Sequence, residues 1–220
     1  MSKHAVIFDL DGTLADTLED IADNMNRVLA GMGFPTHEYD AYRFYVGGGL
    51  RNLVIQCLPK NARTEEIIAA CHDQMVAEYH IHYINKTRLY DGISELLDVL
   101  LLRGIKLAVL SNKADSLTQK ICAVLLKNRN FDIILGATER FPRKPNPSPA
   151  LFISRQMGVN PANIYYLGDS DVDMKTAVAA GFYPVGAGWG FRSKEELFEN
   201  GAREVIYEPA QLLQVMQIRR

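Results

Sequence analysis

The chain lacks the features of secreted, membrane-spanning and nucleic-acid-binding proteins. It has only three cysteines in 220 residues, widely spaced and without a CxxC pair, which favours a protein of the reducing cytoplasm with free thiols. No apolar run approaches the length of a membrane span, and the apolar stretch at the N-terminus is too short for a signal peptide. The formal net charge of -2 indicates no basic surface for nucleic acid. We therefore expect a cytoplasmic protein that binds neither membranes nor nucleic acid.

What the chain does have is an alternation of strand and helix patterns. Strands are expected at 4–10, 105–111, 131–137, 164–169, 182–188 and 204–209, and helices at 92–104, 114–128, 149–159 and 171–181. Several of these strands are almost continuously apolar, as strands covered on both faces are. The pattern predicts an α/β fold, with a Rossmann-like three-layer core built on a parallel sheet.

Nearly a hundred residues separate the first two strands, and their patterns are helical, at 18–33, 49–58 and 64–84. The run DTLE at 16–19 fits a capping box, in which Asp16 caps the first of these helices and Glu19 reaches back. We expect an inserted α-helical cap domain of residues 16–86, and a core domain of residues 1–15 and 87–220. Because the insertion leaves the sheet at a strand's carboxyl end, the cap should cover the ligand crevice.

Two aspartates follow the first strand directly, in the run VIFDLDGT. Burying Asp9 and Asp11 together costs several kcal/mol unless a positive charge lies beside them. Further polar residues follow the later strands or the loop RKPNPSP, namely Ser111, Asn112, Lys113, Lys144, Asp169, Ser170 and Asp173. Converging carboxylates suit Mg²⁺, and lysine and hydroxyl groups beside a metal suit a phosphate group. One carboxylate can attack phosphorus, and a second, two residues on, can act as acid and then as base.

Several of these residues also have purely structural interpretations. Asp173 fits the third position of a capping box begun by Ser170, and we give this structural role and a functional role equal weight. Lys113 is more readily a solvated surface charge than a functional group. The glycines at 47–49 fit a flexible hinge or a helix start, and a contact between their amides and a substrate carboxylate, with Arg51 as charged partner, is the less favoured alternative.

The motifs DLDGT, SNK, RKPNP and GDSDVD, in this order, resemble those of the haloacid dehalogenase superfamily of phosphohydrolases. The resemblance covers nearly the whole chain and includes the inserted helical cap. It implies that Asp9 is the nucleophile and Asp11 the general acid and base, and that Ser111 and Lys144 bind the phosphoryl group. The implied Mg²⁺ ligands are the side chains of Asp9 and Asp169 and the backbone carbonyl of Asp11, with Asp173 supporting them. The runs GDSDVD and YVGGGLRNLV look most like the phosphoglycolate phosphatase branch.

The expected function is therefore Mg²⁺-dependent hydrolysis of a small phosphorylated metabolite, 2-phosphoglycolate by resemblance, through an aspartyl-phosphate. Substrate-binding residues are expected at Thr13, Asn112, Gly48 and Arg51. The alternatives are a pyrophosphatase, a sugar-phosphate phosphatase, a nucleotidase, a phosphomutase similar to β-phosphoglucomutase, and a catalytically silent binding or regulatory protein. The last of these is disfavoured because the chain keeps Asp9, Asp11, Lys144 and Asp169. We expect a monomer or a homodimer.

Overall fold

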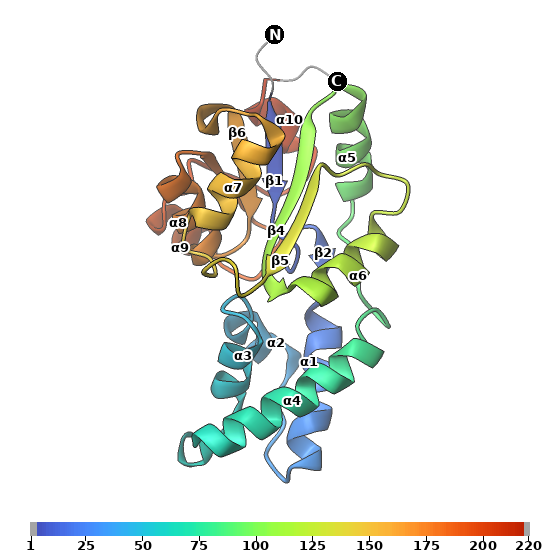
Figure 1. The fold of residues 1–220 in the computed structure, drawn as a ribbon, viewed down its shortest axis with the longest axis vertical. Coiled ribbons are helices and arrows are strands. Elements are labelled where there is room, and N and C mark those ends of the chain that lie inside the picture. Colours follow the sequence, from blue (N-terminus) through green and yellow to red (C-terminus); the bar gives the residue numbers. More distant parts are fainter. Residues whose placement is uncertain (1–3, 218–220) are drawn as a thin grey trace.

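A six-stranded parallel sheet forms the centre of the larger part of the molecule (Figure 1). The computed structural model describes residues 4–217. The strand order is β5-β4-β1-β6-β7-β8, so β1 lies in the middle between β4 and β6. The strands are β1 Ala5–Phe8, β4 Lys106–Ala114, β5 Ile133–Ala137, β6 Ile164–Gly168, β7 Tyr183–Ala187 and β8 Glu204–Ile206.

Helices cover both faces of this sheet. Alternate side chains of β1 point to opposite faces, with Val6 and Phe8 in one apolar cluster and Ala5 and Ile7 in another. The helices that pack in the first cluster are α5 Ile93–Leu102, α6 Asp115–Leu125 and α10 Gln211–Val215. The second contains α7 Ser148–Met157 and α8 Asp171–Ala180, and α9 Lys194–Glu199 packs beside α8. The predicted three-layer α/β core is therefore confirmed.

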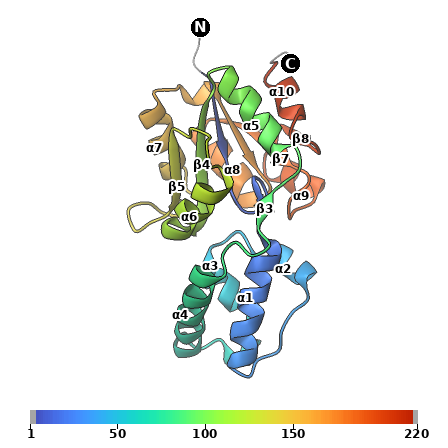
Figure 2. The same cartoon turned by 90° about the vertical axis from the view of Figure 1, so that its right-hand side faces the viewer.

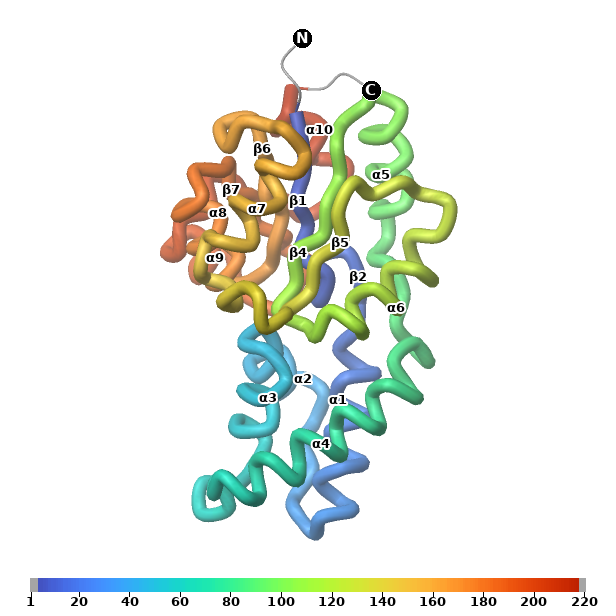
Figure 3. Tube along the Cα trace, viewed as in Figure 1, coloured from blue at the N-terminus to red at the C-terminus, as the bar shows by residue number. Residues whose placement is uncertain are grey.

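Four helices between β1 and β4 form a cap beyond the carboxyl ends of the strands (Figures 1 and 2). They are α1 Leu18–Gly31, α2 Tyr39–Tyr45, α3 Leu50–Cys57 and α4 Glu65–Ile81. The trace enters the cap through the short strand β2 Ala15–Asp16 (Figure 3). It leaves through β3 Arg88–Leu89, which pairs with β2 in antiparallel orientation (Figure 2). The cap's apolar cluster also includes Leu117 and Phe191, which lie outside residues 16–86. The division into a cap of residues 16–86 and a core of residues 1–15 and 87–220 therefore stays a prediction.

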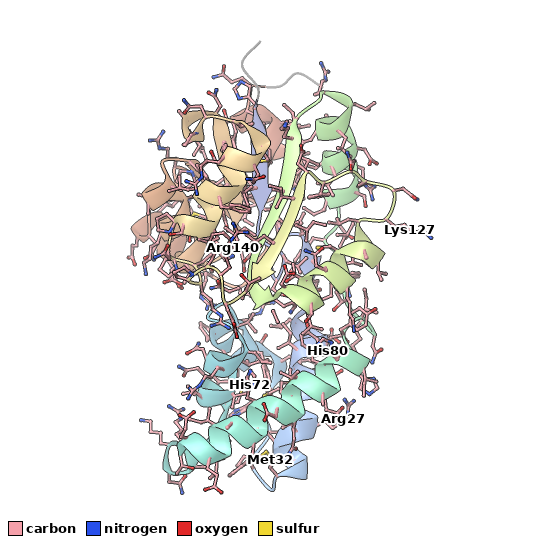
Figure 4. The ribbon with its side chains drawn as sticks, in the orientation of Figure 1. Arg27, Met32, His72, His80, Lys127 and Arg140 are labelled. Atoms are coloured by element: carbon pink, nitrogen blue, oxygen red, sulfur yellow. The ribbon has the colours of Figure 1, made fainter. Side chains whose placement is uncertain are left out.

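Within residues 4–217, no helix combines the length and the apolar character needed to cross a bilayer. The longest cap helix, α4, carries His72 and His80 along its length (Figure 4).

The start of α1 differs from the sequence prediction. Asp16 does not cap the helix, because it belongs to β2 and its carboxylate forms an ion pair with Arg88 at 3.2 Å. Thr17 stands at the cap position instead, and its hydroxyl donates to Asp11 at 2.7 Å rather than accepting from the helix. The short pairing with β3 therefore sets the entry of the chain into the cap. Helices α2, α9 and α10 were also not predicted, since each is too short to show a clear helical period.

Candidate active site

Asp9 follows the last residue of β1 and is held from several sides. Its backbone amide continues the sheet by donating to Leu167 O at 2.9 Å. Its Oδ1 accepts from the amide of Leu10 at 2.7 Å and lies 2.9 Å from Lys144 Nζ. Burial raises the pKa of the Asp9 carboxyl well above its usual range, and the nearby Asp173 raises it further while Lys144 opposes the rise. The site thus holds a buried carboxylate in a fixed orientation next to a buried cation.

Lys144 lies at the centre of this network. The loop that carries it brings Nζ to within 2.7 Å of Asp173 Oδ1 and lets it donate to Leu110 O at 3.1 Å. Asp173 also forms the predicted capping box with Ser170 at the start of α8. Burial alone would lower the pKa of Lys144, but Asp173 and Asp9 raise it above the ordinary value, so the side chain carries a positive charge.

Asp169 follows β6, the neighbour of β1, and completes the acidic cluster. Its Oδ1 accepts from the Thr13 hydroxyl at 3.0 Å and its Oδ2 from the amide of Phe191 at 2.8 Å. Burial raises the pKa of Asp169 to about 7, with Asp173 adding to the rise. Gly12 is required here, because its φ is +79° and a Cβ on it would lie 2.2 Å from Asp169 Oδ2. Thr13 was expected to bind substrate, which stays a prediction, and in the structure its hydroxyl orients Asp169.

Asp11 pairs with Lys113, which is not a solvated surface charge. Lys113 Nζ lies 2.8 Å from Asp11 Oδ1, and its side chain is only 6% exposed. The same ammonium donates to the hydroxyl of Tyr79 on α4 at 2.8 Å and lies 4.6 Å from the centre of that ring. The tertiary structure buries Lys113 because the cap closes over it, which the local sequence does not reveal.

An irregularity in β4 brings Ser111, Asn112 and Lys113 to the carboxyl edge of the sheet. The pairing of β4 with β5 changes register between Leu110 and Ala114, as at a β-bulge, and such bulges redirect side chains. Asn112 was expected to bind substrate, which stays a prediction, and its amide group makes three hydrogen bonds within the protein. It donates to Gly47 O at 2.9 Å and Lys144 O at 3.1 Å and accepts from Lys144 N at 2.9 Å. Asn112 therefore positions the Lys144 loop.

A pocket of about 60 Å³ opens between these side chains and the cap. On the core side, the polar residues that line it are Asp9, Asp11, Ser111, Asn112, Lys113, Asp169 and Ser170. From the cap come Ile21, Val46, Gly47, Gly49, Leu50, Leu53 and Tyr79. Gly48 and Arg51 are not among the lining residues, and Arg51 forms an exposed ion pair with Glu65. The structure thus brings together the expected catalytic residues but not these two cap residues.

The acidic cluster fits a hard divalent cation. Among residues 4–217, Asp9, Asp169 and Asp173 form the one group of three or more ligating side chains, with one oxygen of each within 4.8 Å of the others. All three are buried, and carboxylate oxygens are the donors that Mg²⁺ prefers. The three carboxylates repel one another at these distances, and a bound cation would reduce that repulsion.

The geometry agrees with the comparison to known proteins. The model of the haloacid dehalogenase-like hydrolases matches residues 6–187. The chain belongs to this family. A phosphoglycolate phosphatase from Aquifex aeolicus is 33% identical over 190 residues, which are 84% of this chain and 85% of that protein. One from Pseudomonas putida is 31% identical over 84% of this chain and 70% of its own length.

Solved structures agree as well. A crystal structure described as a predicted phosphoglycolate phosphatase from Haemophilus somnus superposes with a TM-score of 0.90 at 27% identity, over 99% of both chains. Together these matches confirm the sequence prediction of a haloacid dehalogenase-like phosphatase similar to the phosphoglycolate phosphatase branch.

Sequence reasoning missed two contributors to the site. One is Tyr79, which lies in the last turn of α4 and meets Lys113 across the pocket. The other is the loop after β7, where Phe191 binds Asp169 and the indole of Trp189 donates to Thr13 O at 3.0 Å. The available signal for this loop was its glycine-rich sequence directly after a predicted strand, because loops at the carboxyl ends of neighbouring parallel strands converge.

Proposed function

We propose that the protein is a Mg²⁺-dependent phosphomonoester hydrolase of the cytoplasm that works through an aspartyl-phosphate on Asp9, and that its substrate is 2-phosphoglycolate. The observation that carries this proposal is the placement of Asp9. It is a buried carboxylate at the end of the central strand, held by Lys144 and facing a small pocket beside Asp11. A carboxylate so placed suits attack on phosphorus rather than a structural role.

In the first half of the reaction, a carboxylate oxygen of Asp9 attacks phosphorus and the bond from phosphorus to the leaving oxygen breaks. Lys144, 2.9 Å from Asp9 Oδ1, and the hydroxyl of Ser111 offset the negative charge of the transferring group. Asp11 donates a proton to the leaving oxygen, which departs as an alcohol. The Thr17 hydroxyl and Lys113 hold Asp11 at 2.7 and 2.8 Å for this step.

In the second half, Asp11 takes a proton from a water molecule that attacks the phosphorus of the intermediate. The bond from phosphorus to Asp9 breaks, inorganic phosphate is released and the Asp9 carboxylate is restored. The cap covers the pocket and limits the entry of other nucleophiles, because a closed lid of this kind keeps bulk water away from the reacting groups.

Asp9 and Asp169 would hold the Mg²⁺ ion with the backbone carbonyl of Asp11, and Asp173 would support them. When bound, the ion supplies charge stabilisation to the transferring phosphoryl group. The chain's own contribution is orientation. Thr13 and the Phe191 amide fix both oxygens of Asp169, and Lys144 fixes Asp173.

The proposed substrate rests on the named relatives and on the size of the pocket. The volume of about 60 Å³ is well below the roughly 300–1,000 Å³ of sites for drug-sized ligands, which favours a compact phosphoester over a nucleotide.

The test is a phosphate-release screen with and without Mg²⁺, in which 2-phosphoglycolate is compared with pyrophosphate, sugar phosphates and nucleoside monophosphates as substrates. We expect the highest kcat/KM for 2-phosphoglycolate and no phosphate release without the metal. A sugar bisphosphate should not stimulate the reaction, because such stimulation would indicate a mutase. No release from any ester would contradict the proposal.

A further inference from the structure

The cap wall of the pocket offers very few polar side chains. Of the cap residues that line it within the described part of the chain, Ile21, Val46, Leu50 and Leu53 are apolar and Gly47 and Gly49 have no side chain. Tyr79 alone contributes a polar side-chain group. On the core side, Lys113 is the single cation among the described lining residues.

Tyr79 and Lys113 meet across the boundary between cap and core. Lys113 Nζ donates to the Tyr79 hydroxyl at 2.8 Å, and both side chains are buried. An ammonium has three donor hydrogens, so after serving Asp11 and Tyr79 it retains one for a ligand. Because the Tyr79 oxygen accepts from Lys113, the proton of the same hydroxyl remains available to donate.

Both groups are donors at neutral pH. Burial raises the pKa of Tyr79 to about 12, with Lys113 opposing the rise, so the hydroxyl keeps its proton. Burial alone would lower the pKa of Lys113, but Asp11 and Tyr79 raise it above the ordinary value. The pair therefore presents donor hydrogens, one set on a cation that also contacts Asp11, in a pocket whose cap wall is otherwise apolar.

The proposed reaction fixes which part of the substrate reaches this pair. Attack by Asp9 expels the leaving oxygen on the opposite side of phosphorus, toward Asp11 and the cap. Whatever follows that oxygen must lie against the cap wall. A carboxylate there would lose its hydration against apolar side chains unless a cation and donors replaced it, and Lys113 and Tyr79 can supply these.

We propose that Lys113 and Tyr79 bind the carboxylate of the substrate and so select short phosphorylated carboxylic acids over phosphorylated alcohols of equal length. This inference rests on the proposed function and adds the specificity-determining residues. Tyr79 is the cap's contribution, so the carboxylate also ties the cap to the core when the substrate is bound.

The experiment compares substrates that differ only in this group. The first pair is 2-phosphoglycolate and 2-hydroxyethyl phosphate, and the second is 3-phosphoglycerate and glycerol 3-phosphate. For the wild type, we expect a higher kcat/KM for the carboxylate than for the alcohol in the pair that is hydrolysed faster. Tyr79→Phe keeps the ring over Lys113 and deletes the hydroxyl, and should lower the ratio of carboxylate to alcohol about ten- to a hundredfold, mainly through KM.

The matched control is Tyr45→Phe, which deletes a hydroxyl from a cap tyrosine that packs on His37 and Tyr42 and does not line the pocket. It should leave the ratio unchanged, and melting temperatures should show that both variants are folded. A wild type that hydrolyses these esters without preferring the carboxylate would overturn the inference. So would a Tyr79→Phe variant that loses activity equally on both members of a pair, since Tyr79 would then only stabilise the cap. Absence of hydrolysis of every ester by wild type would instead contradict the proposed function.

Discussion

The side chain of Asn112 joins the core to the cap, since its amide nitrogen donates to the carbonyl oxygen of Gly47 at 2.9 Å. The same side chain bonds both the amide and the carbonyl of Lys144, at 2.9 and 3.1 Å. One amide group thus connects β4, the loop of the buried lysine and the glycine segment of the cap. Deleting it should disturb the placement of Lys144 as well as the seating of the cap.

Asn112→Ala is expected to lower the free energy of unfolding by about 1–3 kcal/mol, because it leaves backbone groups at Lys144 and Gly47 without partners. It should also lower kcat about tenfold or more, since misplacement of groups around phosphorus is costly. Urea denaturation and steady-state kinetics measure the two effects. The control is Asn146→Ala, whose exposed side chain accepts from the amide of Ser148 at the start of α7. If both variants lost activity equally, the loop as a whole, rather than Asn112, would be responsible.

Asp9→Asn should abolish turnover and leave the protein folded. The amide has nearly the shape of the carboxylate but cannot attack phosphorus. It also removes one of three crowded negative charges, and Lys144 keeps its partner Asp173 at 2.7 Å. We therefore expect background phosphatase activity, with a melting temperature in chelator no lower than that of wild type. Substantial steady-state activity in a clean preparation would exclude Asp9 as the nucleophile.

Mg²⁺ should raise the melting temperature of the wild type, because a ligand that binds only the folded state stabilises it by mass action. Chelator should reverse the increase and stop turnover. Ca²⁺ should also raise the melting temperature but support little turnover, since its coordination is longer and less regular. Asp169→Asn should lose the Mg²⁺ response. Asp171→Asn is the matched control, because Asp171 stands two residues on and pairs with Lys175 at 2.7 Å. An equal response in Asp169→Asn and wild type would place the metal elsewhere.

Arg51→Ala separates the sequence prediction from the geometry. The sequence suggests a cationic partner for substrate, whereas in the structure Arg51 pairs with Glu65 and is absent from the pocket lining. An exposed pair of this kind contributes on the order of 0–1 kcal/mol to stability. We expect kcat/KM for 2-phosphoglycolate to change less than about threefold, since the residue lies outside the lining. A loss selective for the carboxylate-bearing ester would mean that Arg51 turns into the site when substrate binds.

Most of the proposed site residues were predictable because they follow strands of a parallel sheet. Asp9 and Asp169 come after long apolar runs, and the carboxyl ends of such strands meet at one edge. The order of the motifs added Lys144, which lies on a loop without any periodic signal. The same reasoning predicted the layers of the core, since the alternation of helix and strand over most of the chain is regular.

The contacts between cap and core were not predictable, because they depend on how two separately packed parts meet. Tyr79 belongs to a helix of ordinary composition, and only the closure of the cap brings it to Lys113. The same closure turns Lys113 from an expected surface charge into a buried one. The failed capping box at Asp16 has a similar cause, because a long-range pairing with Arg88 outweighs a local preference.

Asp173→Asn tests whether this residue is a metal ligand or a support. Each of its oxygens accepts from two donors, since Oδ1 accepts from Lys144 at 2.7 Å and Tyr166 at 3.2 Å, and Oδ2 accepts from the Ser170 hydroxyl and amide. Each oxygen of Asp169 accepts from one donor and so keeps a lone pair for a cation. We therefore expect Asp173 to hold Lys144 rather than bind the cation directly. The amide should weaken the grip on Lys144 and lower kcat about tenfold or more. The Mg²⁺-dependent rise in melting temperature should largely remain, in contrast to Asp169→Asn. If Asp173→Asn lost that rise as completely as Asp169→Asn, one of its oxygens would have to leave Lys144 or Ser170 and ligate the ion.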